Sequence, residues 1–434
     1  MGKRRNTKME PYVLNDIALE KFVNGGQALG YTTDGKPVFV WGALAGETVD
    51  VLVSKAKKGI LEGVAEKVKV KSPNRIEPLE QEEYMSTSPW QILSYGYENE
   101  VKLSLLRQTF KHEAGIDFAD TEMAQGKKEY GYRNKMEYNF WGDDEGVHLA
   151  LHKRGTGQKI KLSGSALASE AINKAGKELV SFLNLNKIFA GDLKSIVLRS
   201  NRVGECVGAL FVKKEKFGEF EAPKSLKGLV CYYSNPKSPA SVKTSEIWRI
   251  GDITLSDEVC GTALEYDVDS FFQVNIEIFE KAIEDIRTKL NPKTKKVIDF
   301  YGGVGSIGVL VADGRALEIV DIDKDNAQMA KQNLAKLKLD NAEVVCLPGE
   351  DSLDSIVTDS TLIVDPPRAG LHKRVVQQIA EVKPKQVIYL SCNPVTQARD
   401  VKILVEAGYK ISFAKGYNFF PRTPHIESLV ILEC

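Results

Sequence analysis

Long apolar runs and paired cysteines are both missing from this 434-residue chain. No apolar stretch approaches the roughly 20 residues that cross a bilayer, so we expect no membrane segment. No apolar stretch follows the basic start, MGKRRNTKME, so we expect no secretory signal there. The six cysteines lie far apart, at positions 206, 231, 260, 346, 392 and 434. This spacing predicts neither a disulfide framework nor a zinc site, and we expect a soluble, cytoplasmic protein.

Net charge is also missing, since 59 Lys and Arg balance 59 Asp and Glu. With 43% apolar residues, the composition excludes a disordered chain and leaves room for two or three domains. Basic residues still gather in residues 1–78, which hold 13 Lys or Arg against nine Asp or Glu. Residues 1–10 form a basic tail, and lysine clusters follow at 55–58 and 67–71. A phosphate-rich partner suits this excess, and a solvated surface is the alternative explanation.

Three regions follow the tail. Residues 11–71 contain about five short alternating strands broken by Gly or Asp-Gly, which predicts a small barrel of the OB type, a common nucleic-acid binder. Residues 72–75 (Ser-Pro-Asn-Arg) are expected to be a linker. Residues 72–285 have a mixed α+β pattern, with helices expected near 97–114 and 168–185. Residues 286–434 alternate strands and helices, which predicts a doubly wound, Rossmann-like α/β domain.

A glycine-rich turn opens this last region, where Tyr301-Gly302-Gly303-Val304-Gly305-Ser306 follows the strand Val-Ile-Asp-Phe. Glycines between a strand and a helix let the backbone approach a ligand closely. Asp321 ends the next strand, where a carboxylate can accept both hydroxyls of a ribose. No phosphate-loop GK[ST] motif is present, so a triphosphate is not expected. A dinucleotide and S-adenosylmethionine both remain open, and a purely structural turn is the alternative.

Two further strands run into polar turns. Asp365-Pro366-Pro367-Arg368 follows an apolar strand, and its prolines predict a rigid wall for a planar ring, or simply a rigid turn. Cys392 lies at the tip of the next strand, before a possible helix N-terminus. Such a position is expected to lower the thiol pKa and to favour a nucleophilic thiolate. His425 and Glu427, just before the last strand, are candidate proton-transfer partners.

Taken together in their order along the chain, these glycine-rich, proline-rich and cysteine-containing segments resemble those of the RNA (uracil-5-)-methyltransferase family. The resemblance lies in DPPRAGL (365–371), YLSCNPVT (389–396) and FPRTPHIE (420–427), downstream of the YGGVGSIG turn and of FFQVN (271–275). Upstream, YRNKME (132–137) is similar to the family's central motif, and residues 11–75 are similar to its N-terminal TRAM domain. The resemblance therefore covers nearly the whole chain. It implies a Rossmann-like class I methyltransferase domain, a central α+β region and an RNA-binding barrel.

The resemblance also implies roles for individual residues. Cys392 would be the nucleophile that adds to C6 of a flipped uridine, and Glu427 the general base that removes the C5 proton. Supporting roles fall to Arg368, Asn393, Thr396 and His425, with Arg368 or Asn393 stabilising the enolate oxygen. The S-adenosylmethionine pocket would be lined by Gln273, Tyr301, Ser306, Asp321, Glu350 and Asp365.

One motif departs from the family pattern. Many ribosomal RNA members carry a four-cysteine iron–sulfur motif ending in a CGGCxxQ-like segment, whereas residues 85–91 here read MSTSPWQ and no cysteine precedes position 206. We therefore expect no iron–sulfur cluster and no other metal.

We expect 23S ribosomal RNA as the substrate. We expect neither DNA nor a membrane as a partner. Transfer RNA is the first alternative, although its typical enzymes lack a TRAM domain. An RNA cytosine-5-methyltransferase is the second alternative, because it uses the same cysteine addition. The third is a non-catalytic RNA-binding assembly factor.

Overall fold

The computed structural model describes residues 10–154, 158–238 and 240–434. The predicted basic tail, apart from residue 10, lies outside the described residues. The chain forms two compact units, the first made of residues 1–105, 150–162 and 420–425 and the second of the remainder. The predicted boundary between residues 71 and 72 lies inside the first unit. In the described parts of the chain, no helix has the length and apolar character needed to cross a membrane.

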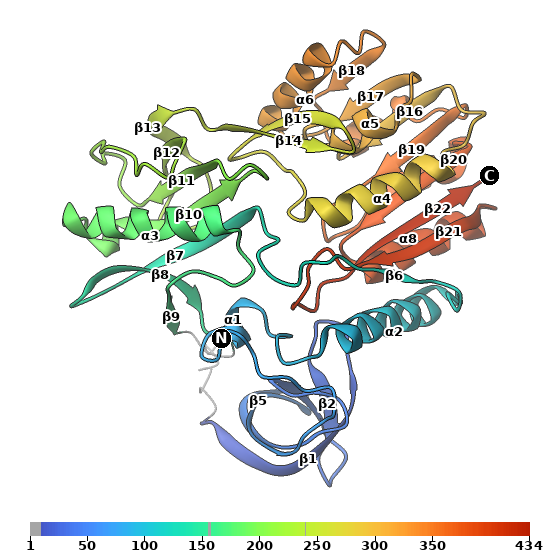
Figure 1. Ribbon diagram of the computed structural model, residues 1–434. Helices are drawn as coiled ribbons and strands as arrows, with labels where there is room; N and C mark the ends of the chain where they lie inside the picture. Colours follow the sequence, from blue (N-terminus) through green and yellow to red (C-terminus); the bar gives the residue numbers. More distant parts are fainter. Residues whose placement is uncertain (1–9, 155–157, 239) are drawn as a thin grey trace, which may run out of the picture. The chain divides into compact units, whose positions relative to one another are not determined.

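The first unit contains a closed five-stranded barrel, seen as a ring at the base of Figure 1. The strand order is β1-β2-β3-β5-β4, so the fourth and fifth strands exchange places relative to a simple meander. Alternate side chains of these strands, such as Val38, Val40, Val49 and Val51, are fully buried and fill the interior. The strands are β1 (Tyr12–Phe22), β2 (Ala28–Tyr31), β3 (Pro37–Trp41), β4 (Thr48–Lys57) and β5 (Ile60–Val70). The barrel predicted for residues 11–71 is confirmed.

The expected linker at 72–75 is instead fixed to the barrel, so that prediction was wrong. Glu47 is only 1% exposed, and its carboxylate accepts the Ser72 backbone N–H at 3.1 Å. The Arg75 guanidinium donates to both oxygens of Glu47, from Nε at 2.6 Å and from Nη2 at 2.7 Å. A buried carboxylate requires such a bidentate partner, and it immobilises the chain where it leaves the barrel.

A second buried ionic cluster holds residues 420–425 within the same unit. Arg422 has a left-handed backbone (φ 65°), and its N–H donates to the two carboxylate oxygens of Glu98 at 3.0 and 3.1 Å. Lys102 donates to the Phe420 carbonyl at 3.0 Å. These contacts compensate the strained residue and the buried charges. The unit also contains α1 (Tyr84–Thr87), the start of α2 (Tyr95–Ala114) and β9 (Lys159–Leu162).

The central part of the second unit is a sheet in which strands follow the order β13-β12-β11-β10-β7-β8. Helix α3 (Glu170–Leu185) packs on it through a buried stripe at helical spacing, and Ser169 caps its N-terminus. A separate hairpin follows. The strands are β7 (Lys135–Asp143), β8 (Gly146–His152), β10 (Leu193–Ser200), β11 (Cys206–Val212), β12 (Gly228–Tyr233), β13 (Ser245–Gly251) and the hairpin β14 (Thr254–Val259) and β15 (Thr262–Asp267).

The C-terminal part is an eight-stranded sheet in the order β18-β17-β16-β19-β20-β22-β21-β6. Neighbouring strands run parallel from β18 to β20, and β22 then lies antiparallel to β20. The strands are β6 (Met123–Ala124), β16 (Lys296–Phe300), β17 (Ala316–Val320), β18 (Ala342–Val345), β19 (Ser360–Val364), β20 (Gln386–Ser391), β21 (Lys410–Tyr417) and β22 (Glu427–Glu433). The predicted Rossmann-like sheet is confirmed.

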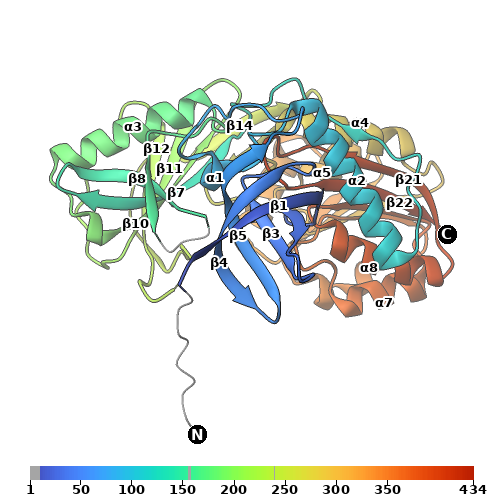
Figure 2. The ribbon, with the colours of Figure 1, turned by 90° about the horizontal axis from the view of Figure 1, so that it is seen from below.

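Helices cover both faces of this sheet. Figure 2 shows α4 on one side of β21 and β22, and α7 and α8 on the other. The helices are α4 (Ile276–Lys289), α5 (Ser306–Val311), α6 (Lys324–Lys336), α7 (Lys373–Val382) and α8 (Pro394–Glu406), with short 3₁₀ turns at Ala190–Asp192, Gly349–Asp351 and Leu353–Ser355. From β16 the chain continues to β17 and β18 on one side and then to β19 and β20 on the other, so the order of strands reverses beside β16. The carboxyl ends of β16, β17, β19 and β20 meet at this topological switch point. Ligands of doubly wound folds bind there.

Candidate functional site

The glycine-rich turn lies at the carboxyl end of β16, as predicted. Gly303 and Gly305 have φ values of 57° and 85°, which glycine adopts without strain. A Cβ at Gly302 would lie 2.7 Å from Ile319, so the turn also needs its small residues for packing. Ser306 follows at the first position of α5 and is buried. The backbone can therefore approach a ligand closely at this turn.

Asp321 directly follows β17, and its carboxylate accepts a hydrogen bond from the glycine-rich turn. Its Oδ2 accepts the Gly303 N–H at 2.9 Å, and its Oδ1 accepts the Asp323 N–H at 2.8 Å. Since each carboxylate oxygen has two lone pairs, Oδ2 keeps one for a ligand hydroxyl.

Tyr301 lies on the same side of the domain as Glu350. The Tyr301 backbone has a left-handed conformation (φ 63°). Burial raises the pKa of its phenol to about 12, and the Glu350 charge adds to this pKa shift. A Cβ at Gly349 would lie 3.2 Å from the Tyr301 hydroxyl. The structure thus brings Tyr301 and Glu350, two predicted cofactor residues, near each other.

Gln273 and Asp365 are joined directly, because Gln273 Nε2 donates to Asp365 Oδ2 at 3.2 Å. Asn134, from the YRNKME motif, donates to the Gln273 backbone carbonyl at 2.9 Å and so fixes this pair.

Asp299 of β16 accepts the Gly308 N–H at 2.7 Å through Oδ2, while its buried Oδ1 has no hydrogen-bond partner among the described residues. Burial raises the pKa of Asp299 to about 7. Burial and the Asp299 charge raise the pKa of Asp365 to about 7.

Stability should therefore fall with rising pH through Asp299. Its pKa is about 7 in the fold against 3.8 ordinarily, so the folded state holds this proton more tightly than the unfolded state. The corresponding stability is complete below pH 4 and is lost as pH rises through 7. Between pH 5 and 8.5 we expect wild type to lose about 2–3 kcal/mol more unfolding free energy than Asp299→Asn. Urea denaturation at both pH values measures this difference, and equal losses would contradict it.

Cys392 and Glu427 come from adjacent antiparallel strands. The register of β20 and β22 pairs Ser391 with Ser428, so Cys392 and Glu427 occupy the next opposed positions. Glu427 is 6% exposed, and its Oε2 has no hydrogen-bond partner within the described residues. Burial raises the pKa of Glu427 well above its usual range. Asp365 raises this pKa further and Arg368 opposes the shift.

The expected lowering of the Cys392 pKa is wrong for the protein alone. Burial, with the charges of Glu427 and Asp365, raises the pKa of this thiol to about 11, and Arg368 opposes the shift only in part. The helix N-terminus is present as predicted, since Asn393 caps α8 by accepting the Val395 N–H at 3.2 Å. Burial of the thiol and the two nearby carboxylates together outweigh the effect of the helix N-terminus on its pKa.

Asn393 and Thr396 act on the loop that carries Arg368. Asn393 Nδ2 and Thr396 Oγ1 donate to the Arg368 carbonyl at 2.8 and 3.3 Å. Because one N–H of the Asn393 amide is engaged by the Arg368 carbonyl and its Oδ1 by the cap, the geometry of Asn393 favours a supporting role. His425 lies in the segment grouped with the first unit, where its ring packs edge-to-face on Phe420 with centroids 5.7 Å apart.

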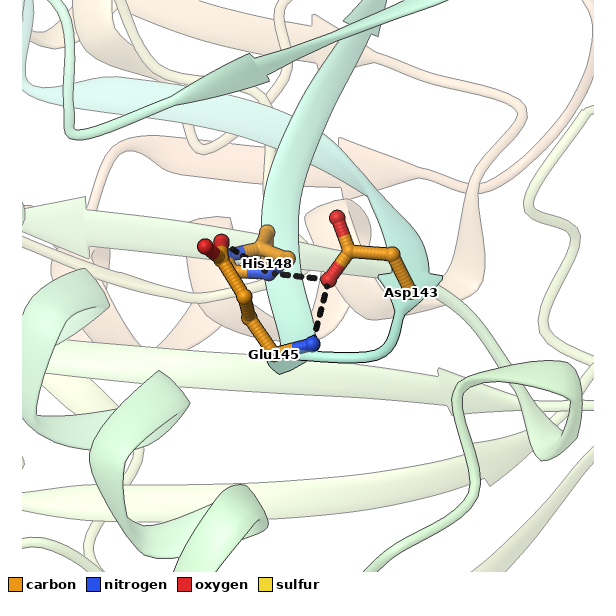
Figure 3. Close-up of side chains that lie close together, drawn as sticks. All are labelled: Asp143, Glu145 and His148. Carbon is orange, nitrogen blue, oxygen red and sulfur yellow. Dashed lines mark hydrogen bonds and ion pairs between the residues drawn. The ribbon is translucent and has the colours of Figure 1, made fainter.

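A cluster of possible metal ligands lies elsewhere, in the β7–β8 hairpin (Figure 3). Asp143 accepts the Glu145 N–H at 3.0 Å and lies 3.0 Å from His148 Nε2. Ordinary turn geometry explains this arrangement, so we assign no metal site to it.

The sequence model of the tRNA (uracil-5-)-methyltransferase family matches residues 95–434, and that of the TRAM domain matches residues 16–65. The chain belongs to this uracil-5-methyltransferase family. An uncharacterized RNA methyltransferase of Fusobacterium nucleatum is 27% identical over 99% of this chain and 98% of its own. One from Caldanaerobacter subterraneus is 29% identical over 96% and 98%.

Among solved structures, the tRNA (uracil-54, C5)-methyltransferase of Pyrococcus abyssi, crystallised with S-adenosyl-L-homocysteine, matches the fold. Its TM-score is 0.75 at 23% identity, and the match covers 98% of this methyltransferase and all of that chain. The predicted fold and family are confirmed.

The protein is an RNA (uracil-5-)-methyltransferase that uses S-adenosylmethionine. The residues at the switch point fit this cofactor: the positive-φ turn admits close approach, and Asp321 offers a carboxylate lone pair. The predicted RNA partner and cofactor are thus confirmed, whereas the identity of the RNA and the residue roles stay predictions.

Proposed function

We propose that this methyltransferase methylates C5 of a uridine in 23S ribosomal RNA, with Cys392 as nucleophile and Glu427 as general base. The observation that carries the catalytic part is the β20–β22 register, which opposes these two residues at the switch point. Oε2 of Glu427 supports it, because this atom accepts no hydrogen bond from the described part of the chain and a base needs a lone pair for the incoming proton.

Uracil C5 is too weak a nucleophile to accept a methyl group unaided. Cys392 forms a bond from Sγ to C6, which moves the C5–C6 π electrons into an enolate and makes C5 nucleophilic. S-adenosylmethionine supplies an electrophilic methyl group at this stage. Glu427 then takes the proton from C5, the C5–C6 double bond reforms, and Cys392 leaves with the electrons of the S–C6 bond.

Arg368 is the cation suited to the intermediate. Its charge opposes the raised pKa values of both Cys392 and Glu427, so it favours the thiolate and the carboxylate that the reaction needs. A guanidinium also donates to an enolate oxygen, whereas the Asn393 amide already donates one N–H to the Arg368 carbonyl. We therefore place Arg368 at the enolate.

Transfer RNA is the second candidate substrate, because the matched Pyrococcus abyssi protein is named as acting on transfer RNA. That match covers 98% of this chain, the barrel included, so the barrel does not decide between the two RNAs. The test is incubation with labelled S-adenosylmethionine and unmodified transcripts of either RNA, followed by nucleoside analysis. We expect 5-methyluridine from 23S ribosomal RNA. Label from transfer RNA alone would overturn the RNA assignment, and 5-methylcytidine would overturn the chemistry.

The barrel should contribute to RNA binding through Lys57 and Lys58. Both are exposed at the hairpin between β4 and β5. Reversing both charges (K57E/K58E) should weaken RNA binding, and the slope of log affinity against log salt should fall by about two, since each phosphate contact contributes nearly one. Affinity for S-adenosylmethionine should stay unchanged.

The matched control is K293E/K295E, the same charge reversal at exposed lysines near the amino-terminal edge of β16, opposite the switch point. Filter binding at several salt concentrations measures both variants. Equal losses of RNA affinity would show that the effect is one of net charge and not of the barrel.

A further inference from the structure

Helix α8 buries two polar side chains that sequence analysis did not single out. Gln397 is fully buried and Asp400 is 1% exposed, and their spacing of three residues places them on one face of the helix. Asp400 accepts the Tyr389 hydroxyl at 2.9 Å and the Leu371 N–H at 2.9 Å. It therefore ties α8 to β20 and to the end of the loop that carries Arg368.

Gln397 makes the more specific set of contacts. Its amide nitrogen donates to the Tyr389 carbonyl at 2.8 Å and to the Ser428 carbonyl at 3.1 Å. Its Oε1 accepts the Ser428 hydroxyl. Tyr389 lies three residues before Cys392, and Ser428 directly follows Glu427. One side chain is thus bonded to both strands that deliver the reacting groups.

We propose that Gln397 is a positioning residue that fixes the carboxylate of Glu427 relative to the thiol of Cys392. The proposal rests on the function proposed above, since it assigns a role to a group that touches neither substrate nor cofactor. A buried amide with both donors and its acceptor engaged is held in one geometry. Leucine at this position would fill similar space but leave two buried carbonyls and one hydroxyl without this partner. The two strand ends would then lose their shared anchor.

Gln397→Leu should lower kcat for uridine methylation by about 100-fold, because a displacement of about 1 Å at reacting groups has an effect of this size. The KM for S-adenosylmethionine should stay within about twofold of wild type. RNA containing 5-fluorouridine separates the steps, since fluorine at C5 cannot be removed as a proton and the covalent adduct accumulates. Adduct formation needs Cys392 but not Glu427, so it should fall by a much smaller factor than turnover.

The chain offers a matched control on β20, the strand that carries the Tyr389 carbonyl bonded by Gln397. Gln386 is also fully buried, and its amide donates to the Lys289 carbonyl at 2.7 Å, but it lies at the opposite end of β20. Gln386→Leu should lower the urea midpoint about as much as Gln397→Leu while leaving kcat within about threefold. Ser428→Ala, which removes only the hydroxyl donor, should lower kcat about tenfold and serves if Gln397→Leu does not fold.

Equal effects of the Gln397 and Gln386 variants on kcat would overturn the proposal. So would a loss of adduct formation as large as the loss of turnover, or an unchanged kcat in Ser428→Ala. These outcomes are separate from failure of the proposed function, which would show as wild-type protein that makes no 5-methyluridine or no covalent adduct.

Discussion

Cys392→Ala is expected to lower 5-methyluridine formation by more than about 10³-fold, because the variant lacks the sulfur that is proposed to bond to C6. Affinity for S-adenosylmethionine should change by less than about twofold, since the predicted cofactor residues lie on other loops. Transfer of labelled methyl groups to RNA measures the first quantity, and equilibrium dialysis the second. The variant should also form no covalent complex with RNA that contains 5-fluorouridine.

Cys260→Ala is the control for this prediction. Cys260 is likewise half-buried, in the turn between β14 and β15, and burial likewise raises the pKa of its thiol. Its loss should leave methylation within about threefold of wild type. Full activity in Cys392→Ala would exclude the covalent route, and equal losses in both variants would indicate a general sensitivity to thiol removal.

Glu427→Gln is expected to accumulate a covalent protein–RNA adduct on ordinary uridine substrates. Cys392 can still add to C6 and C5 can still accept the methyl group, but the C5 proton has no acceptor. Turnover should fall by about 10²–10⁴-fold, the usual contribution of such proton transfer. Denaturing gel electrophoresis should show an RNA-bound band that requires S-adenosylmethionine and is missing from the double variant with Cys392→Ala.

The control is Glu433→Gln, at the far end of the same strand β22, which should form no such band. The wild-type rate should also rise as pH rises, because the pKa values of Glu427 and Cys392 are both raised and the proposed mechanism needs both groups to lose a proton. A Glu427→Gln protein that turns over normally, or that is inactive without any adduct, would remove Glu427 from the role of base.

The fold could be predicted largely from local patterns. Alternating short strands indicated the barrel, and strand–turn–helix units indicated the parallel sheet. The order of DPPRAGL, YLSCNPVT and FPRTPHIE indicated the family, because each motif follows or precedes a strand at the same edge. Bonds such as Gln273 to Asp365 then follow from the topology, although residue spacing alone could not show them.

Interactions between distant segments could not be predicted. Burial raises the thiol pKa of Cys392 most, and carboxylates on two other elements raise it further, so the local helix terminus gave the wrong direction. Glu98 and Arg422 are 324 residues apart, and no sequence pattern links them. Gln397 reads as an ordinary polar helix residue, and its burial becomes visible only once β22 is placed beside β20.

The acidic character of the switch point has a consequence for the exchange of cofactor. Burial is the largest cause of the raised pKa values of Asp299, Asp365 and Glu427, and a neighbouring carboxylate adds to each shift, so this region disfavours further negative charge. S-adenosylmethionine carries a positive sulfonium, whereas the S-adenosylhomocysteine left after transfer has a neutral sulfur. Each turnover therefore removes one positive charge from the pocket, and above pH 7, where Asp299 and Asp365 lose their protons, we expect this loss to weaken binding of the spent cofactor.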